Sequence, residues 1–289
     1  MRIPRFWSTV SGTTKDPQGK LLSFKCSRSS NVSESEARSL AENALQSLFD
    51  AISRNQPLNG YEYGKSDIRE QLIEEIRTEH SQKTIGAITR NSYGALILNT
   101  TNVFFADIDC DLSTPFSQWF KMKFFGTKPP EPFQNIKERE AYLKIEKFFN
   151  QRVSLSGRLY RTPLGLRLIL THEAIDPESD LSARLFDELE ADPLYVRLCK
   201  SQKCYRARLT PKPWRIGMNT PPPYPFSNTE EEQRFQIWLK QYESRSEGFA
   251  GCRILKHFGS ESMPADVATI VEIHDRLSGA AQTSTRKIA

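Results

Sequence analysis

The chain has 289 residues, of which 38% are hydrophobic and 26% are charged, enough to bury a core of ordinary size in one domain or two. Its 40 basic and 35 acidic residues give a net charge of +5, a mild excess that favours anionic partners without identifying one. The opening segment, MRIPRFWSTV, has no apolar run as long as a signal peptide requires, and no stretch approaches the roughly 18 apolar residues of a membrane helix. Five cysteines without a zinc-ligand spacing predict reduced thiols. These features argue against a membrane protein and predict a soluble, cytoplasmic one.

Residues 1–80 are expected to form a strand and helices that pack on the core. A strand is predicted over residues 21–26, and residues 2–7 form either a second, docked strand or a disordered end. A helix begins at Ser33, which opens a capping box, and apolar residues then recur at helical spacing. A second helix is predicted over residues 67–80, because its apolar residues also fit a helical period.

Residues 81–220 are expected to form the core. Short apolar runs separated by turn residues predict an antiparallel meander over residues 85–89, 95–99 and 103–109. Further along, the patterns predict helices over 137–152 and 180–189, strands over 158–162, 166–171 and 204–209, and another segment over 195–200.

Residues 221–280 are expected to form a helical C-terminal extension, and the small, polar residues 281–289 a disordered tail. Two amphipathic helices are predicted, over residues 229–242 and 265–277. Strands and helices thus interleave in the middle of the chain, with helices at both ends, which favours an α+β fold with a partly antiparallel sheet. The predicted helix caps are Asn228 and Ser262, and the predicted helix stop is Gly279.

The stretch FADIDCD places Asp107, Asp109 and Asp111 at alternate positions directly after an apolar run. In a strand, residues two apart share a face about 7 Å from each other, so Asp107 and Asp109 point the same way. Such carboxylates can bind Mg²⁺ or Mn²⁺ together with substrate phosphates, the smallest protein contribution to phosphoryl transfer. The alternative is that the aspartates at the strand end are solvated or cap a turn. Asp111 lies past the end of the predicted strand.

The segment VFFADID resembles the first motif of archaeo-eukaryotic primases and primase-polymerases, an apolar strand that ends in Asp-x-Asp. The family's second motif, a small hydroxyl residue and a glycine leading into a strand with a histidine, binds nucleotide phosphate. The nearest segment here is TPLGLR, in which Arg167 stands in the place of that histidine, and no acid can be assigned to the family's third motif.

This resemblance covers about residues 85–217 and implies a primase-like, RRM-like and mostly antiparallel sheet with flanking helices. The segments ITRNSYGA and RLTPKPWRIG are also similar to a group of uncharacterised bacterial proteins, which implies no activity.

Two segments combine arginine with aromatic residues, a combination that pairs phosphate contact with base stacking. In the last predicted strand of the core, alternation puts Arg206 and Arg208 on one face. The loop that follows carries Lys212, Trp214 and Arg215 between stiffening prolines, and Trp214 is either a core residue or a stacking platform. If the arginines share a face with the aspartates, they either pair with them or form a polyanion site. The predicted phosphate-binding residues are Arg161, Arg167, Arg206, Arg208, Lys212 and Arg215.

His172 follows the strand predicted over residues 166–171 and is a candidate general base or phosphate contact, or else a structural histidine. Together these features predict a primase-like nucleotidyltransferase. Asp107 and Asp109, with Asp111 as a further ligand, would bind Mg²⁺ or Mn²⁺, and the basic residues would hold nucleotide or nucleic acid. One alternative is a non-catalytic nucleic-acid-binding module with an incomplete metal site. The other is a metal-dependent nuclease that uses the same acids.

Overall fold

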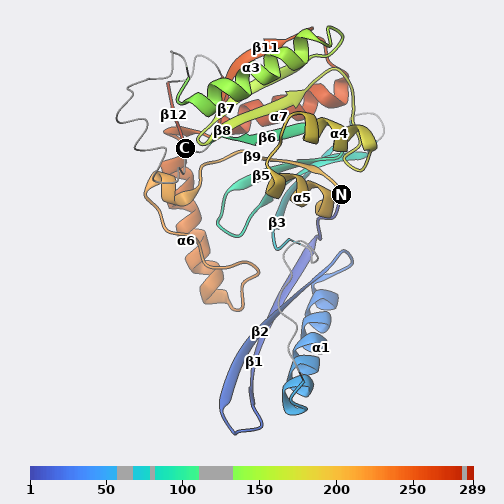
Figure 1. Ribbon diagram of the computed structural model, residues 1–289. Helices are drawn as coiled ribbons and strands as arrows, with labels where there is room; N and C mark the ends of the chain where they lie inside the picture. Colours follow the sequence, from blue (N-terminus) through green and yellow to red (C-terminus); the bar gives the residue numbers. More distant parts are fainter. Residues whose placement is uncertain (57–67, 79–81, 111–132, 282–284) are drawn as a thin grey trace, which may run out of the picture.

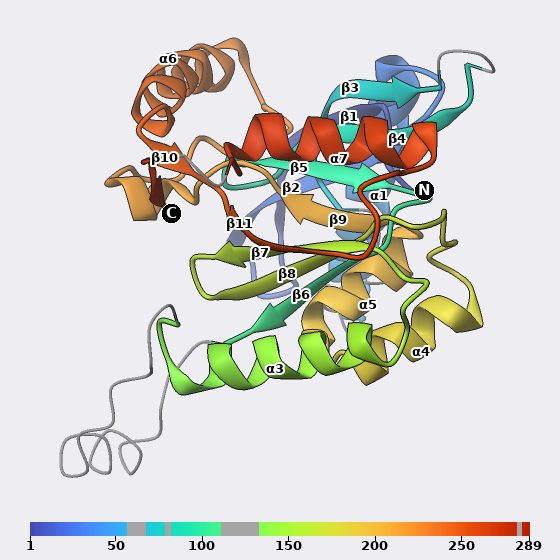
Figure 2. The same cartoon turned by 90° about the horizontal axis from the view of Figure 1, so that it is seen from above.

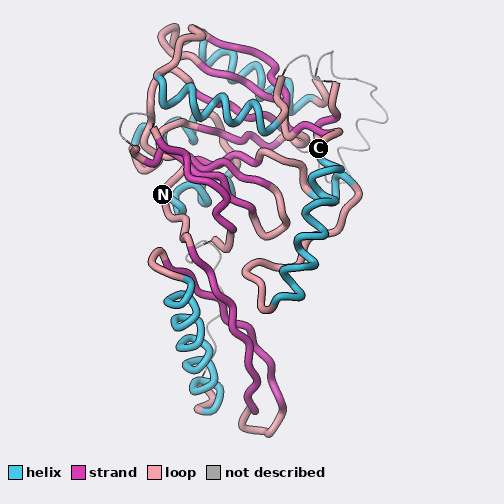
Figure 3. The backbone as a smooth tube through the Cα atoms, turned by 180° about the vertical axis from the view of Figure 1, so that it is seen from behind, coloured by secondary structure: helices cyan, strands magenta, loops and turns pink. Residues whose placement is uncertain are grey.

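A hairpin and a helix near the N-terminus form an arm. The structure, a computed structural model, describes residues 1–56, 68–78, 82–110, 133–281 and 285–289. Figure 1 shows the arm extending away from the other elements, and Figure 3 shows it from behind. The strand predicted over residues 21–26 is confirmed as part of a longer one. The arm consists of the antiparallel strands β1 (Phe6–Lys15) and β2 (Leu21–Ser30) and the helix α1 (Glu34–Ser53).

Local chemistry explains the arm. Ser33 caps α1 as predicted, because its hydroxyl accepts a hydrogen bond from the backbone amide of Glu36 at 3.0 Å. The helix packs on the hairpin through Phe49, whose ring centroid lies 6.4 Å from that of Phe24. Gly12 allows this approach, since a Cβ at that position would lie 3.0 Å from the Phe49 ring.

The rest of the described residues, which we call the body, include two four-stranded sheets in which neighbouring strands are antiparallel. The overall class is therefore α+β with mostly antiparallel sheets, as predicted. The first sheet has the order β3 (Gln71–Arg77), β4 (Thr84–Arg90), β5 (Leu96–Thr100), β9 (Tyr205–Arg208). The second has the order β11 (Arg253–Phe258), β7 (Gly157–Thr162), β8 (Gly165–Leu170), β6 (Phe105–Asp109).

Helices cover both sides of the second sheet. In Figure 2, α7 (Ala265–Ser278) and α3 (Ile136–Asn150) lie on opposite sides of it. α3 contributes Phe149, which stacks on Phe258 of β11 at 4.2 Å. α7 reaches both sheets, because Ile270 packs on β4 at Gly86 and Asp275 accepts a hydrogen bond from Tyr160 of β7. The remaining elements are α3 (Ile136–Asn150), α4 (Asp180–Glu188), α5 (Pro193–Gln202), the 3₁₀ helix η1 (Pro213–Ile216), α6 (Thr229–Ser246), β10 (Phe249–Ala250), α7 (Ala265–Ser278) and β12 (Lys287–Ile288).

The predicted helix over residues 67–80 is wrong where the structure describes it, because residues 71–77 form β3. Its pairing with β4 shifts register between Leu72 and Glu74 and again between Ile76 and Arg77. The first shift leaves Ile73 as an extra residue of β3, so the apolar side chains of β3 lose the strict alternation of a strand and imitate a helical period. The second shift places the extra residue, Ile85, on β4.

The predicted three-stranded meander is also wrong in its last strand. β4 and β5 pair as expected, but β9 occupies the other edge of β5, and β6 pairs with β8 in the second sheet. Periodicity identifies a strand but does not identify its partner.

Residues after 221, predicted to form a helical extension, contribute a strand and a helix to the body. β11 and α7 belong to the body, so the boundary predicted at residue 221 does not separate them from the core. Residues 287–288 pair in parallel with β10, where a disordered tail was predicted. Asn228 caps α6 and Gly279 ends α7, as predicted, whereas α7 begins after Pro264 and Ser262 does not cap it.

Gly165 permits the close approach of β8 to the end of β6, and its replacement by alanine is expected to be strongly destabilising. A Cβ there would overlap the carbonyl oxygen of Ile108 and lie 2.9 Å from the backbone nitrogen of Cys110. We expect Gly165→Ala to lower the free energy of unfolding by about 3 kcal/mol, as overpacking against backbone atoms does. Urea unfolding measures this loss. Gly248→Ala is the matched control, since a Cβ at that position meets no atom within 4 Å.

Candidate functional site

The two described aspartates of the FADIDCD segment lie at the C-terminal end of β6. Strand alternation places Asp107 and Asp109 on one face, while Ala106 and Ile108 point to the buried side. Antiparallel pairing sets Asp107 opposite Arg167 of β8. Asp109 is exposed, and Asp111 lies outside the described residues.

Arg167 holds the side chain of Asp107. Its Nε and Nη2 atoms donate to the two carboxylate oxygens of Asp107 at 2.7 and 3.0 Å, a bidentate ion pair. The Arg167 side chain is only 3% exposed and that of Asp107 is 33% exposed. Burial alone would lower the pKa of Arg167, but the Asp107 carboxylate raises it above its usual value, so the guanidinium stays charged. The acid and the arginine predicted to be separate ligands are therefore each other's partner.

Arg167 also joins the second sheet to the first sheet and to α7. Its Nη1 atom donates to the backbone carbonyl of Arg208 at 3.1 Å and lies 3.3 Å from Nε2 of His274. Because a guanidinium only donates, Nε2 of His274 faces it as the acceptor. Burial lowers the pKa of His274, but the neighbouring Cys252 and Asp275 raise it above its usual value. Nδ1 of the same ring lies 2.9 Å from a carboxylate oxygen of Asp275, which accepts the hydrogen bond. The β6 acid, two sheets and α7 thus share one hydrogen-bond network.

Sequence reasoning gave little weight to His274, predicted only a reduced thiol at Cys252, and did not consider Asp275. Cys252 lies 3.9 Å from Nε2 of His274, so the three residues have the order of a thiol-hydrolase triad. Both Cys252 and His274 are completely buried, however, so neither side chain is open to solvent in the described structure. The arrangement is structural, and no spacing in the sequence marks it, because the cysteine and the histidine come from different elements.

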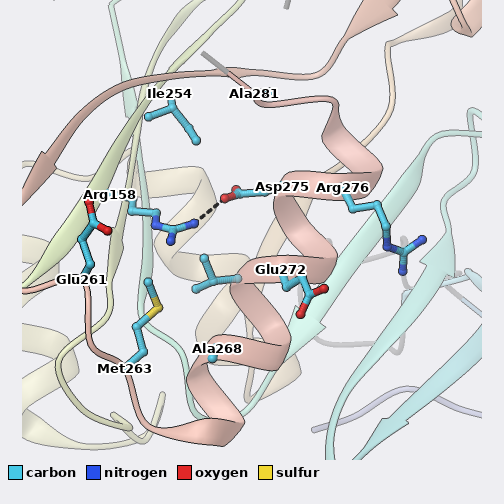
Figure 4. Close-up of a pocket in the computed structure, with 10 residues that line it drawn as sticks. Arg158, Ile254, Glu261, Met263, Ala268, Glu272, Asp275, Arg276 and Ala281 are labelled. Carbon is cyan, nitrogen blue, oxygen red and sulfur yellow. Dashed lines mark hydrogen bonds and ion pairs between the residues drawn. The ribbon is translucent and has the colours of Figure 1, made fainter. Parts of the chain in front are cut away.

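The network ends at the surface beside a pocket of about 620 Å³. Figure 4 shows Arg158 of β7 reaching toward Asp275 of α7 at its wall, and the two are joined at 2.6 Å. The rest of the wall mixes apolar residues with exposed Glu261, Glu272 and Arg276. Because it pairs with Asp275, the Arg158 guanidinium belongs to the hydrogen-bond network.

Three of the predicted phosphate-binding residues, Arg208, Lys212 and Arg215, lie close together, and Asp109 is near Lys212. The pKa of Lys212 is lowered by burial and by the nearby positive charges of Arg208 and Arg215, and Asp109 partly offsets this effect. Arg208 has a buried Nε atom without a hydrogen-bond partner among the described residues. Closely placed cations that lower one another's affinity for protons favour the binding of an anion.

Trp214 stands within this cluster of cations. Its side chain is 52% exposed, although tryptophan is usually well buried. Nζ of Lys212 lies 5.3 Å from its ring centroid, and the edge of Tyr93 packs against it at 5.3 Å. The 3₁₀ helix η1, opened by Pro213, presents both Trp214 and Arg215. We call the surface of Arg208, Lys212, Trp214 and Arg215 the basic–aromatic surface.

The remaining predicted phosphate-binding and catalytic residues either pair with acidic side chains or lie away from the aspartates of β6. Arg206 donates to Glu70 at 2.6 Å in a buried ion pair, and Arg161 donates to Glu138 at 2.5 Å. His172 follows β8, which runs antiparallel to β6, so it lies beyond the start of β6 and not beside Asp109. The structure does not bring His172 to the aspartates.

No group of three or more His, Cys, Asp or Glu side chains in the described part of the chain is placed to hold a metal ion. No helix within the described ranges is long and apolar enough to cross a membrane. No protein-family model matches the chain, and comparisons with curated proteins and with solved structures return no significant match.

Proposed function

We propose that this protein binds single-stranded nucleic acid at the basic–aromatic surface, without a metal ion. The observation that carries the proposal is the exposed Trp214 ring set among Arg208, Lys212 and Arg215. Basic side chains neutralise backbone phosphates, and an exposed indole stacks on bases of any sequence. A single strand suits this surface because its bases are open to stacking.

The ion pair of Asp107 with Arg167 supports binding over phosphoryl transfer. A metal ion at Asp107 would have to compete with a buried guanidinium that donates to both carboxylate oxygens. The metal-dependent nucleotidyltransferase and the nuclease are the alternative proposals, in which Asp109 and Asp111 would be the remaining acids for Mg²⁺ or Mn²⁺.

Fluorescence anisotropy with a labelled single-stranded oligonucleotide tests the proposal. We expect equal affinity in EDTA and in Mn²⁺, and a logarithmic salt dependence with a slope of about −2, since three phosphate contacts release counterions at about −0.7 each. Binding that requires Mn²⁺, or nucleotide incorporation that is lost in Asp109→Ala, would instead favour the catalytic alternative.

Removal of the Trp214 ring is expected to weaken oligonucleotide binding without unfolding the protein. Stacking contributes about 1–3 kcal/mol per base, so Trp214→Ala is expected to raise Kd by about 5- to 150-fold. Trp214→Phe keeps an aromatic face and is expected to retain most of the affinity. Equal affinities of the alanine variant and the wild type in anisotropy titrations would show that the ring does not stack on a base.

A further inference from the structure

A second candidate site lies between the first sheet, α6 and the segment around β12. It is a cavity of about 300 Å³, near the lower end of the range for small-molecule pockets. Arg90, at the end of β4, lines it together with Thr210, Tyr242 and Arg286. Figure 1 shows the C-terminus beside one end of α6, which brings the β12 segment to this cavity.

Arg90 is a buried cation whose charge is incompletely matched. Its side chain is 8% exposed, and its Nη1 atom donates to the backbone carbonyl of Gly94 at 2.9 Å. Its Nε atom is buried without a hydrogen-bond partner in the described part of the chain. Burial lowers the pKa of Arg90, and Glu243 only partly offsets this. A buried guanidinium in such a setting favours an anion that completes its bonding.

Glu243 does not fill this role. Its carboxylate lies 3.7 Å from Nη2 of Arg90, beyond hydrogen-bond distance, and its side chain is 60% exposed. Glu243 and Glu247 are both exposed residues of the lining, and so is Arg286. Arg90 is therefore the buried charge of the cavity, and the acids are at its rim.

We propose that this cavity binds a phosphate group, with Arg90 as its principal ligand. A guanidinium fork matches the oxygens of a phosphate bidentately, and the several terminal oxygens of a phosphate can accept from both Arg90 and Arg286. The phosphate comes either from a small molecule or from the end of a nucleic-acid strand. The second source would link the two sites, which share chain segments: Tyr93, three residues after Arg90, packs against Trp214, and Thr210 leads into Lys212.

Calorimetric titration of inorganic phosphate at low ionic strength tests the site apart from nucleic-acid binding. We expect Arg90→Lys, which keeps the charge but loses the fork, to weaken phosphate binding about tenfold or more. Glu243→Gln removes the competing carboxylate and is expected to strengthen binding by up to about fivefold. Lys240→Gln is the control, because it removes a charge from the exposed side of the same helix.

The proposal is wrong if the wild type and Glu243→Gln do not bind phosphate, or if Arg90→Lys binds it as well as the wild type does. If Arg90→Lys does not fold, the affinity of Glu243→Gln for phosphate decides whether the proposal holds, because the exposed Glu243 tolerates this substitution. The proposal is then wrong if Glu243→Gln does not bind phosphate more tightly than the wild type. Adenosine monophosphate and matched 5′-phosphate and 5′-hydroxyl oligonucleotides then identify the source. A preference for the 5′-phosphate strand that Arg90→Lys removes assigns the cavity to strand ends, and Arg90-dependent binding of the free nucleotide assigns it to small molecules.

Discussion

Asp107→Asn is expected to lower the free energy of unfolding by about 3 kcal/mol, the lower end of the range for breaking a buried ion pair, because Asp107 is partly exposed. The change removes the charge that compensates Arg167, a side chain with almost no access to water. Arg167 would then hold an unmatched positive charge between two sheets. Urea unfolding, followed by circular dichroism, measures the loss.

Asp109→Asn is the matched control on the same strand, two residues away and on the same face. Because Asp109 is exposed, we expect its replacement to change the free energy of unfolding by less than about 1 kcal/mol. Equal effects of the two substitutions would indicate that the Asp107–Arg167 pair does not form in solution. Asp107 would then be available as a metal ligand, and the nucleotidyltransferase alternative would gain support.

Replacing the three cations of the basic–aromatic surface is expected to weaken single-strand binding about 100-fold at 0.1 M salt. Each phosphate contact gives a salt slope of about −0.7. Each contact therefore raises the affinity about fivefold at 0.1 M salt compared with its affinity at 1 M salt. The variant is Arg208→Gln/Lys212→Gln/Arg215→Gln. Its salt dependence should be nearly flat, because few counterions remain to be released. Anisotropy titrations at several salt concentrations measure both effects.

A triple substitution on the arm separates a local contact from a general effect of charge. Lys15→Gln/Lys20→Gln/Arg28→Gln removes the same number of exposed positive charges from the hairpin. We expect it to reduce affinity only weakly, through the long-range field. A loss as large as that of the first variant would place binding outside the basic–aromatic surface.

The candidate site was partly visible in the sequence. The alternation of apolar residues and aspartates in FADIDCD is sufficient to predict β6 and the shared face of Asp107 and Asp109. The prolines around Lys212 and Arg215 likewise mark a stiff, exposed loop. In contrast, Arg167 and Arg206 look like phosphate ligands in the sequence, and their acidic partners, Asp107 and Glu70, are identified only by three-dimensional proximity.

Local sequence by itself determined the elements whose stability depends on residues a few positions apart. The cap of α1 at Ser33, the cap of α6 at Asn228 and the stop of α7 at Gly279 are of this kind, since each satisfies backbone groups within one helical turn. The strands β5 and β6 are also of this kind, because alternation is a local pattern.

Only the tertiary structure decided which of these elements meet. β6 leaves the first sheet to pair with β8, which sets Asp107 opposite Arg167, and α7 then brings His274 to the same guanidinium. Periodicity specifies which face of an element is apolar, but strand order and register specify which charges face each other, and these depend on contacts between distant segments. For this reason the sequence predicted the acids and the cations, whereas the fold determined that Asp107 is paired and that Arg208, Lys212 and Arg215 lie together around Trp214.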